Sequence, residues 1–194
     1  DLPEYYGIIP WTQDEQALCE EKARYAGDAI AALAADSELI ADEALRLIRV
    51  DYEVLPAVMT IEEALAHPEI KVNERAAEGN ISKHVHLEFG EVDAGLAASD
   101  VVVEGDYWYE GSTHAPIEPH CCVADFDATG LLTVWSSTQV AHYLHRDLAR
   151  VLGLPTQRIR VIQPVVGGAF GGKSEPFSLE FCAAKLSMIT GRPV

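Results

Sequence analysis

The chain carries at residues 159–174 the stretch Ile-Arg-Val-Ile-Gln-Pro-Val-Val-Gly-Gly-Ala-Phe-Gly-Gly-Lys-Ser. Its first four residues form an apolar, strand-like run, and a helix-like run follows from Glu175 to Leu186. Four glycines fall within the six positions 167–172. Because glycine has no Cβ, such a loop lets the backbone approach another group very closely. The stretch therefore predicts a strand, a close-contact loop and a helix in succession.

Three explanations compete for this loop. Residues 167–174 match the pattern G-x-x-x-x-G-K-[ST] of phosphate-binding loops, but only residues 175–194 follow, too few for the acidic strand end that holds magnesium in such nucleotide hydrolases. A turn that merely packs is the second explanation, although the glycines carry a large entropic cost for that purpose. The third, which we favour, is contact with a large cofactor, with Phe170 presented at its edge.

Two other segments carry polar side chains of interest. Trp135-Ser136-Ser137-Thr138-Gln139 ends an apolar strand and places a carboxamide where it can donate to an oxo or phosphate ligand, although a glutamine there is also common as a surface residue. The segment His114-Ala115-Pro116-Ile117-Glu118-Pro119-His120 combines two histidines with a glutamate. Its prolines hold it extended and no third ligand is suitably spaced, so we do not expect these side chains to bind a metal.

Composition narrows the function classes. The chain has 194 residues, is 48% hydrophobic and has a formal net charge of −17, so it can form a core and disfavours nucleic acid as a partner. It contains neither an apolar run long enough to span a membrane nor an initial signal peptide, and we expect a cytoplasmic protein. The four cysteines form no C-x-x-C pair and are expected to be reduced and buried, so an iron–sulfur cluster would belong to another chain.

Periodicity and turn signals predict a mixed series of elements. Strands are predicted at residues 29–35, 48–54, 84–89, 101–109, 121–126, 131–135 and 158–162, and helices after Ser37 and at 61–66, 93–98, 140–152 and 175–186. Asp127-Ala128-Thr129-Gly130 is a hairpin turn signal between two of the strands. The polar stretch 67–83 is the best candidate for a linker.

Taken together, these segments resemble the large, molybdenum-binding subunit of the xanthine dehydrogenase and aldehyde oxidase family. The matching stretches run in the family's order over nearly the whole chain: YAGDAIA at 25–31, VDYEVLP at 50–56, EPH at 118–120, LTVWSSTQ at 132–139, GGAFGGK at 167–173 and GRPV at 191–194. The resemblance implies an α+β fold. Residues 1–66 would form an N-terminally incomplete α/β hammerhead domain, 67–83 a linker, and 84–194 the C-terminally incomplete start of a molybdopterin-binding domain.

The resemblance also implies a cofactor site. Gln139 aligns with the family glutamine that hydrogen-bonds the apical molybdenum ligand, so it would act on the metal through that ligand. The loop that lies against the metal and the pterin corresponds to Gly168, Ala169, Phe170 and Gly171. The implied cofactor is molybdopterin, in its cytosine dinucleotide form, with [2Fe-2S] clusters and FAD on partner subunits. The family's catalytic glutamate lies beyond this stretch, so no catalytic residue is expected here, and the rest of the large subunit would be a necessary partner.

Within the family, His142-Tyr143-Leu144-His145-Arg146 and Gly172-Lys173-Ser174-Glu175-Pro176-Phe177 look most like 4-hydroxybenzoyl-CoA reductase. That resemblance implies reductive removal of a phenolic hydroxyl from an aromatic CoA thioester. Purine-oxidising relatives carry an acidic residue where this chain has Ser174, which argues against a purine substrate. A non-catalytic scaffold of the same fold and a phosphate-loop nucleotide hydrolase are the two alternatives from other classes.

Overall fold

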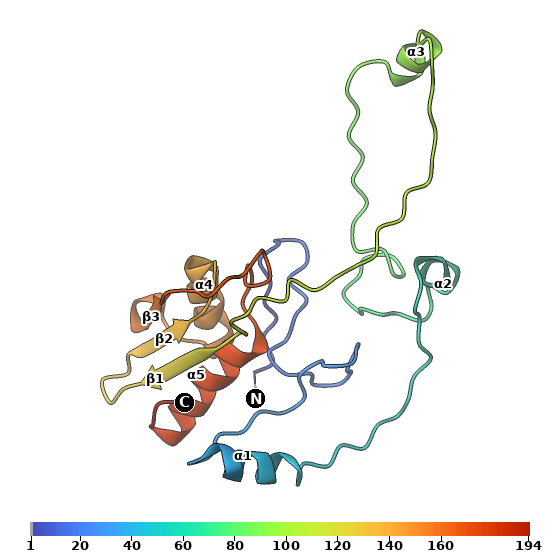
Figure 1. The fold of residues 1–194 in the computed structure, drawn as a ribbon. Coiled ribbons are helices and arrows are strands. Elements are labelled where there is room, and N and C mark those ends of the chain that lie inside the picture. The colour runs from blue at the N-terminus through green and yellow to red at the C-terminus, as the bar shows by residue number, and fades with distance from the viewer. Residues whose placement is uncertain (1) are drawn as a thin grey trace.

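The computed structural model describes residues 2–194 and contains one three-stranded sheet. Strands β1 (Cys122–Phe126) and β2 (Leu132–Ser136) pair antiparallel, and β2 pairs parallel with β3 (Ile159–Ile162), giving the order β1-β2-β3 (Figure 1). The hairpin turn between β1 and β2 is closed by Asp127, whose Oδ1 accepts from the backbone N–H groups of Thr129 at 2.8 Å and Leu131 at 3.1 Å. The predicted hairpin is confirmed.

Two helices pack against this sheet. Helix α4 (Ala141–Leu152) and a short 3₁₀ turn, η1 (Thr156–Arg158), make the crossover between the parallel strands, and α5 (Ser178–Thr190) packs along β1 (Figure 1). Helix α5 begins later than predicted because Pro176 disfavours helical geometry at the residue before it. Both helices end at a glycine in the left-handed conformation, Gly153 and Gly191.

The core lies between the sheet and these helices. Alternate residues of β2 are buried, and α4 and α5 each present a buried apolar face. The N-terminal segment completes this core, since the Tyr6 ring packs against the Phe181 ring in a tilted arrangement with centroids 4.4 Å apart. The fully enclosed apolar residues are Ala17, Ala124, Leu132, Val134, Leu144, Leu148, Phe181 and Ala184. The predicted α+β class is confirmed.

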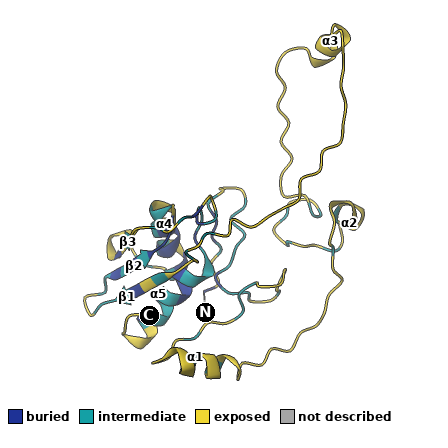
Figure 2. Cartoon of the chain, in the orientation of Figure 1, coloured by how far each residue is buried: buried dark blue, intermediate teal, exposed yellow. Residues whose placement is uncertain are grey.

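The middle of the chain is very different. Helices α1 (Glu38–Leu45), α2 (Ile61–Ala66) and α3 (Val92–Ala97) form as predicted, with the Ser37 side chain capping α1, but none of them contains a buried residue. Residues 18–121 include no buried residue at all (Figure 2). In Figure 1 the segment 84–113 rises away from the rest as a long excursion with α3 at its tip.

Four strand predictions are wrong. The segments 29–35, 48–54, 84–89 and 101–109 are extended, but none joins a sheet in the described part of the chain. A strand forms only when a neighbouring strand satisfies its backbone hydrogen bonds. Alternating side chains predict which face of a strand is buried, but they do not predict which strand will pair with it.

Two further findings concern whole-chain properties. Across residues 2–194, none of the helices has the length and apolar character needed to cross a bilayer. The four cysteines are unpaired, but only Cys182 is buried, so the expectation that all four are buried is wrong. Cys121 is exposed because it precedes β1, at a point where the chain has not yet entered the core.

Candidate functional site

The residues that the sequence predicts for the site lie together at one edge of the sheet. Gln139 follows β2 and the glycine loop follows β3. These two strands are parallel neighbours, so their carboxyl ends meet at the same edge. The Gln139 backbone N–H donates to the Lys173 carbonyl at 2.9 Å, and the Lys173 N–H donates to the Gln139 side-chain oxygen Oε1 at 3.2 Å. The fold thus brings together two motifs that are 34 residues apart.

These contacts orient the Gln139 carboxamide. Its Oε1 also accepts from the Ser174 hydroxyl at 3.1 Å, so the oxygen end is held by two donors of the loop. Since the two ends of a carboxamide are opposite in character, the Nε2 amide then points away as a hydrogen-bond donor. The residue is exposed, and within residues 2–194 its Nε2 has no hydrogen-bond acceptor. The arrangement therefore presents an N–H donor at the sheet edge.

The loop itself holds a strained tip. Phe170 has φ of 54°, in the left-handed region that non-glycine residues rarely adopt, and its side chain is 75% exposed. Gly168 and Gly171 on either side have φ of 98° and 91°, where a Cβ would be unfavourable. Ala169 is buried beneath the tip. Strain of this kind costs roughly 1–3 kcal/mol and is typical of sites that contact a ligand.

A second segment, which sequence reasoning set aside as a metal site, supports the loop from below. A Cβ added to Gly167 would lie 2.8 Å from the Glu118 Cβ, and one added to Gly172 would lie 2.9 Å from the His114 ring. These two glycines are therefore required by packing against residues 114–118. The packing explanation holds for Gly167 and Gly172, whereas Gly168 and Gly171 serve the backbone turn around Phe170.

Glu118 and Lys173 form an ion pair under the loop. The Lys173 Nζ lies 2.7 Å from the Glu118 Oε2, and its residue is only 1% exposed. The same Oε2 accepts from the Gly167 N–H at 2.7 Å. Lys173 and then the Gly167 N–H hold the pKa of Glu118 below its usual value. A phosphate-binding lysine must be free to reach its ligand, so this pairing argues against the phosphate-loop explanation.

Sequence reasoning missed this pairing of Glu118 with Lys173. A lysine directly after the glycine-rich stretch 167–172 is the signal that could have revealed it, because such a lysine needs an acidic partner once it is buried. The His120 imidazole adds a contact, with Nε2 lying 2.8 Å from the Gly172 carbonyl. Across residues 2–194, no group of three or more His, Cys, Asp or Glu side chains could hold a metal ion.

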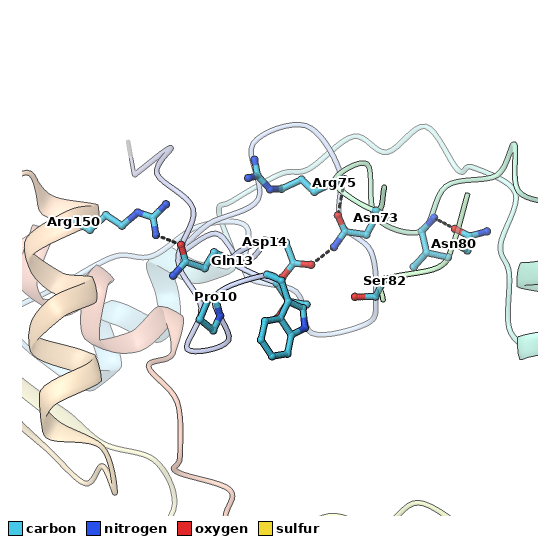
Figure 3. A pocket seen from close by; sticks show the side chains of 12 residues that line it. Pro10, Gln13, Asp14, Asn73, Arg75, Asn80, Ser82 and Arg150 are labelled. Carbon is cyan, nitrogen blue, oxygen red and sulfur yellow. Dashed lines mark hydrogen bonds between the residues drawn. The ribbon is translucent and has the colours of Figure 1, made fainter. Parts of the chain in front are cut away.

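A separate cavity lies between the N-terminal segment and the polar stretch that follows α2 (Figure 3). It has a volume of about 310 Å³, and Asn73 donates across it to Asp14 at 2.6 Å while Arg150 donates to Gln13. None of the predicted site residues lines this cavity. These hydrogen bonds join two parts of the chain, and the cavity does not extend the loop site.

Comparison with known proteins agrees with these motifs. Residues 72–194 match the family described as molybdopterin cofactor-binding domain, and residues 1–56 match the aldehyde oxidase and xanthine dehydrogenase a/b hammerhead domain. The chain is 40% identical over 189 residues, 97% of its length, to the nicotinate dehydrogenase large molybdopterin subunit of Eubacterium barkeri. It is 37% identical, again over 97% of its length, to a probable xanthine dehydrogenase subunit of Bacillus subtilis (strain 168).

Solved structures show the same relationship. Quinoline 2-oxidoreductase from Pseudomonas putida 86 matches 100% of this chain with a TM-score of 0.84 and 31% identity, and the aldehyde oxidoreductase from Desulfovibrio gigas matches 99% with a TM-score of 0.81 and 32% identity. The chain spans 43% and 25% of the two sequence relatives and 24% and 21% of the two structures. On these grounds, the chain belongs to the molybdopterin-binding large subunits of the xanthine dehydrogenase and aldehyde oxidase family.

Proposed function

We propose that this chain supplies one wall of the molybdenum site in an oxidoreductase, with Gln139 and the loop Gly168–Gly171 facing the cofactor. The observation that carries the proposal is the orientation of Gln139. Its oxygen is held by the Lys173 N–H and the Ser174 hydroxyl, which leaves the amide N–H₂ as an exposed donor beside the strained Phe170 tip. A packing turn gains nothing from an exposed donor or a strained exposed phenylalanine, whereas a cofactor site uses both.

The residues present fit a molybdopterin group. The Gln139 Nε2 would donate a hydrogen bond to an oxygen ligand of the metal. The loop has no Cβ atoms at Gly168 and Gly171, and the Phe170 side chain is 75% exposed. When bound, the molybdenum centre supplies two-electron redox chemistry. The task of this chain is then to orient the group, to hold an N–H donor at its apical ligand and to exclude water with Phe170.

We further propose the cytosine dinucleotide form of the cofactor, [2Fe-2S] and FAD groups on partner subunits, and a cytoplasmic location. These assignments rest on the family resemblance. A base for the reaction would come from the rest of the large subunit, which the chain needs for turnover. The boundaries at residues 66 and 84 between hammerhead, linker and molybdopterin-binding regions likewise remain a prediction.

The substrate class that we propose is an aromatic or heteroaromatic ring. The relatives named for nicotinate and quinoline suggest a nitrogen heterocycle. Ser174, in place of the acidic residue of purine-oxidising relatives, argues against xanthine. The finer assignment, reductive dehydroxylation of 4-hydroxybenzoyl-CoA, rests on two short stretches and remains a prediction. A screen of the assembled enzyme with nicotinate, quinoline, xanthine and 4-hydroxybenzoyl-CoA separates these substrates.

The central test is the variant Gln139→Ala in the assembled enzyme. We expect molybdenum to be retained, because the variant removes one hydrogen-bond donor and leaves the glycine loop in place, and kcat to fall by about 10²–10³, as for the loss of one donor to a developing charge. The matched control is Gln157→Ala, an exposed glutamine in η1 that lies outside the loop. An unchanged kcat in Gln139→Ala would show that Gln139 does not have the role assigned to it. Absence of molybdenum and pterin from the intact native assembly would instead favour the non-catalytic scaffold.

A further inference from the structure

The ion pair beneath the glycine loop has an unusual geometry. One carboxylate oxygen, the Glu118 Oε2, accepts from both ends of the loop: from the Gly167 N–H at 2.7 Å and from the Lys173 Nζ at 2.7 Å. The loop tip, with Phe170, lies midway between these ends. The side chain of Lys173 is 1% exposed, whereas that of Glu118 is 30% exposed. The contact therefore closes the loop with a single atom from another segment.

We propose that Glu118 and Lys173 act as positioning residues, a clasp that fixes the loop tip at Phe170 and, through the Lys173 backbone, the orientation of the Gln139 carboxamide. Only the second experiment below, which uses the enzyme with its cofactor bound, rests on the proposed function. The clasp itself is a property of the chain's own residues.

Burial makes the clasp strong. A lysine ammonium that is almost wholly removed from water needs a charged acceptor, since an unpaired buried charge is very unfavourable. Hydrogen bonds to a charged group are also shorter and stronger than neutral ones. Lys173 thus cannot move without either exposing its ammonium or carrying Glu118 with it, and Glu118 is tied in turn to Gly167. The strained conformation of Phe170 persists because both ends of its loop are fixed.

The Lys173 backbone transmits this position to Gln139. Its carbonyl accepts from the Gln139 N–H at 2.9 Å, and its N–H donates to the Gln139 Oε1 at 3.2 Å. The neighbouring Gly172 carbonyl is held by His120 at 2.8 Å, which comes from the same segment as Glu118. If the Lys173 side chain loses Glu118 as its partner, the Lys173 backbone is no longer fixed, and the Gln139 carboxamide loses its orientation. The clasp therefore acts on Gln139 through the backbone, without a direct contact to the exposed amide.

The first experiment uses chymotrypsin on the chain without cofactor. Phe170 is 75% exposed but rigidly held, Phe89 is 83% exposed in the unpaired excursion, and Phe181 is fully buried. We expect Lys173→Met and Glu118→Gln to raise the rate of cleavage after Phe170, relative to Phe89, by about tenfold, the effect of losing one charge-assisted hydrogen bond in local opening. Phe181 should remain protected, which shows that the opening is local.

The control is a second lysine–glutamate pair of similar sequence separation. Lys22 and Glu74 lie 2.9 Å apart, but both are more exposed than Lys173 and neither belongs to the loop. Lys22→Met should leave the Phe170-to-Phe89 ratio unchanged. An unchanged ratio in Lys173→Met would overturn the clasp. Simultaneous exposure of Phe181 would make the pair a support of the whole fold, which would also overturn a positioning role.

The second experiment uses the assembled enzyme and separates positioning from stability. In Glu118→Gln, whose amide oxygen can still accept from Gly167, we expect a changed electron paramagnetic resonance spectrum of the molybdenum and about a tenfold fall in kcat with little change in KM. A wild-type spectrum and kcat in a variant that opens the loop would contradict transmission to Gln139. Wild-type enzyme without molybdenum would defeat the proposed function instead, and would leave the chymotrypsin result to decide the clasp.

Discussion

At the scale of single residues, the site depends on where side chains are absent as much as on those present. Gly172 lies against the His114 ring, Gly167 against Glu118, and Phe170 adopts a left-handed backbone between two glycines that share its turn. Each of these positions accepts few residue types. A Cβ at either glycine would clash with the neighbouring segment, and the backbone conformation at Phe170 is unfavourable for most side chains.

Gly172→Ala should destabilise the protein. Its Cβ would lie 2.9 Å from the His114 Cγ and Nδ1, closer than real contacts allow, and we expect the free energy of unfolding to fall by about 1–3 kcal/mol. The control Gly111→Ala places a Cβ in open space at a position without positive φ and should have little effect. Chemical denaturation of both variants checks this, and adding His114→Ala should restore part of the loss, since the His114 Cβ would still lie 3.1 Å away. Equal stability of the two alanine variants would contradict the close packing.

Glu15 should make stability depend on pH. Burial first, and then the charges of Glu175, Asp14 and Asp147, raise its pKa from 4.5 to about 7. A carboxyl with a raised pKa in the folded state binds its proton more tightly there than when unfolded, so its stabilising contribution is complete below pH 4.5 and is lost as pH rises to about 7.

The variant Glu15→Gln isolates this contribution. It should be more stable than the wild type at pH 8, and the difference in unfolding free energy should shrink as pH falls from about 7 to 4.5. Thermal unfolding across that range measures it, with Glu20→Gln, an exposed residue of the same segment, as the control. A difference that does not vary with pH would show that Glu15 titrates normally.

At the scale of elements, an amphipathic pattern did not guarantee burial. The spacing of Leu39, Ile40 and Leu47 predicts an apolar helix face. Helix α1 forms with its Ser37 cap but ends at Leu45, before Leu47, and all three residues are exposed. Helix α4, in which apolar and polar residues are more sharply segregated, buries Leu144, Leu148 and Val151 against the sheet. Local signals suffice to begin and end both helices, but only contact with another layer decides whether their apolar faces contribute to stability.

Leucine truncation should separate these two helices. Leu148→Ala removes a fully enclosed side chain and should lower the unfolding free energy by about 2–5 kcal/mol. Leu39→Ala, at a residue that is 70% exposed, should change it by about 0.5 kcal/mol or less. Urea denaturation of both variants gives the comparison. A large loss in Leu39→Ala would mean that α1 packs against another surface.

At the scale of the whole molecule, stability is unevenly distributed. Among the described residues 2–194, those that are buried lie in 2–17 or 124–187, and the intervening part, including the excursion at 84–113, leaves many large apolar side chains in water. Regions with few buried contacts open at low free-energy cost. The chain therefore combines a small stable unit around the sheet with a long segment that has little support of its own.

Limited proteolysis of the isolated chain should reflect this division. The first cuts should fall within residues 84–113, and a fragment containing β1 through α5 should persist. Amide hydrogen exchange should show the same order, with protection concentrated in the three strands, α4 and α5. Mass spectrometry identifies the cuts, and a first cut between β1 and α5 would show that the burial pattern does not govern stability.

The sequence alone was sufficient for whatever is encoded locally. It predicted the β1–β2 hairpin from its turn residues, all five α-helices within a few residues, the glycine loop after β3, and Gln139 at the end of β2. Caps, prolines, glycines and hydrophobic periods act over a few residues, so they can be read without knowing the fold. The motifs in family order also predicted the family, which the comparisons confirmed.

Tertiary structure alone decided which segments meet. The four wrong strands have suitable residues but no neighbour, whereas the parallel pairing of β2 with β3 places Gln139 beside Lys173. The same arrangement buries the Lys173 ammonium in an ion pair with Glu118, 55 positions away. The lysine of the phosphate-loop pattern therefore stabilises the loop. Such contacts depend on non-local pairing and on the burial of charge, and neither quantity is encoded within any short stretch of residues.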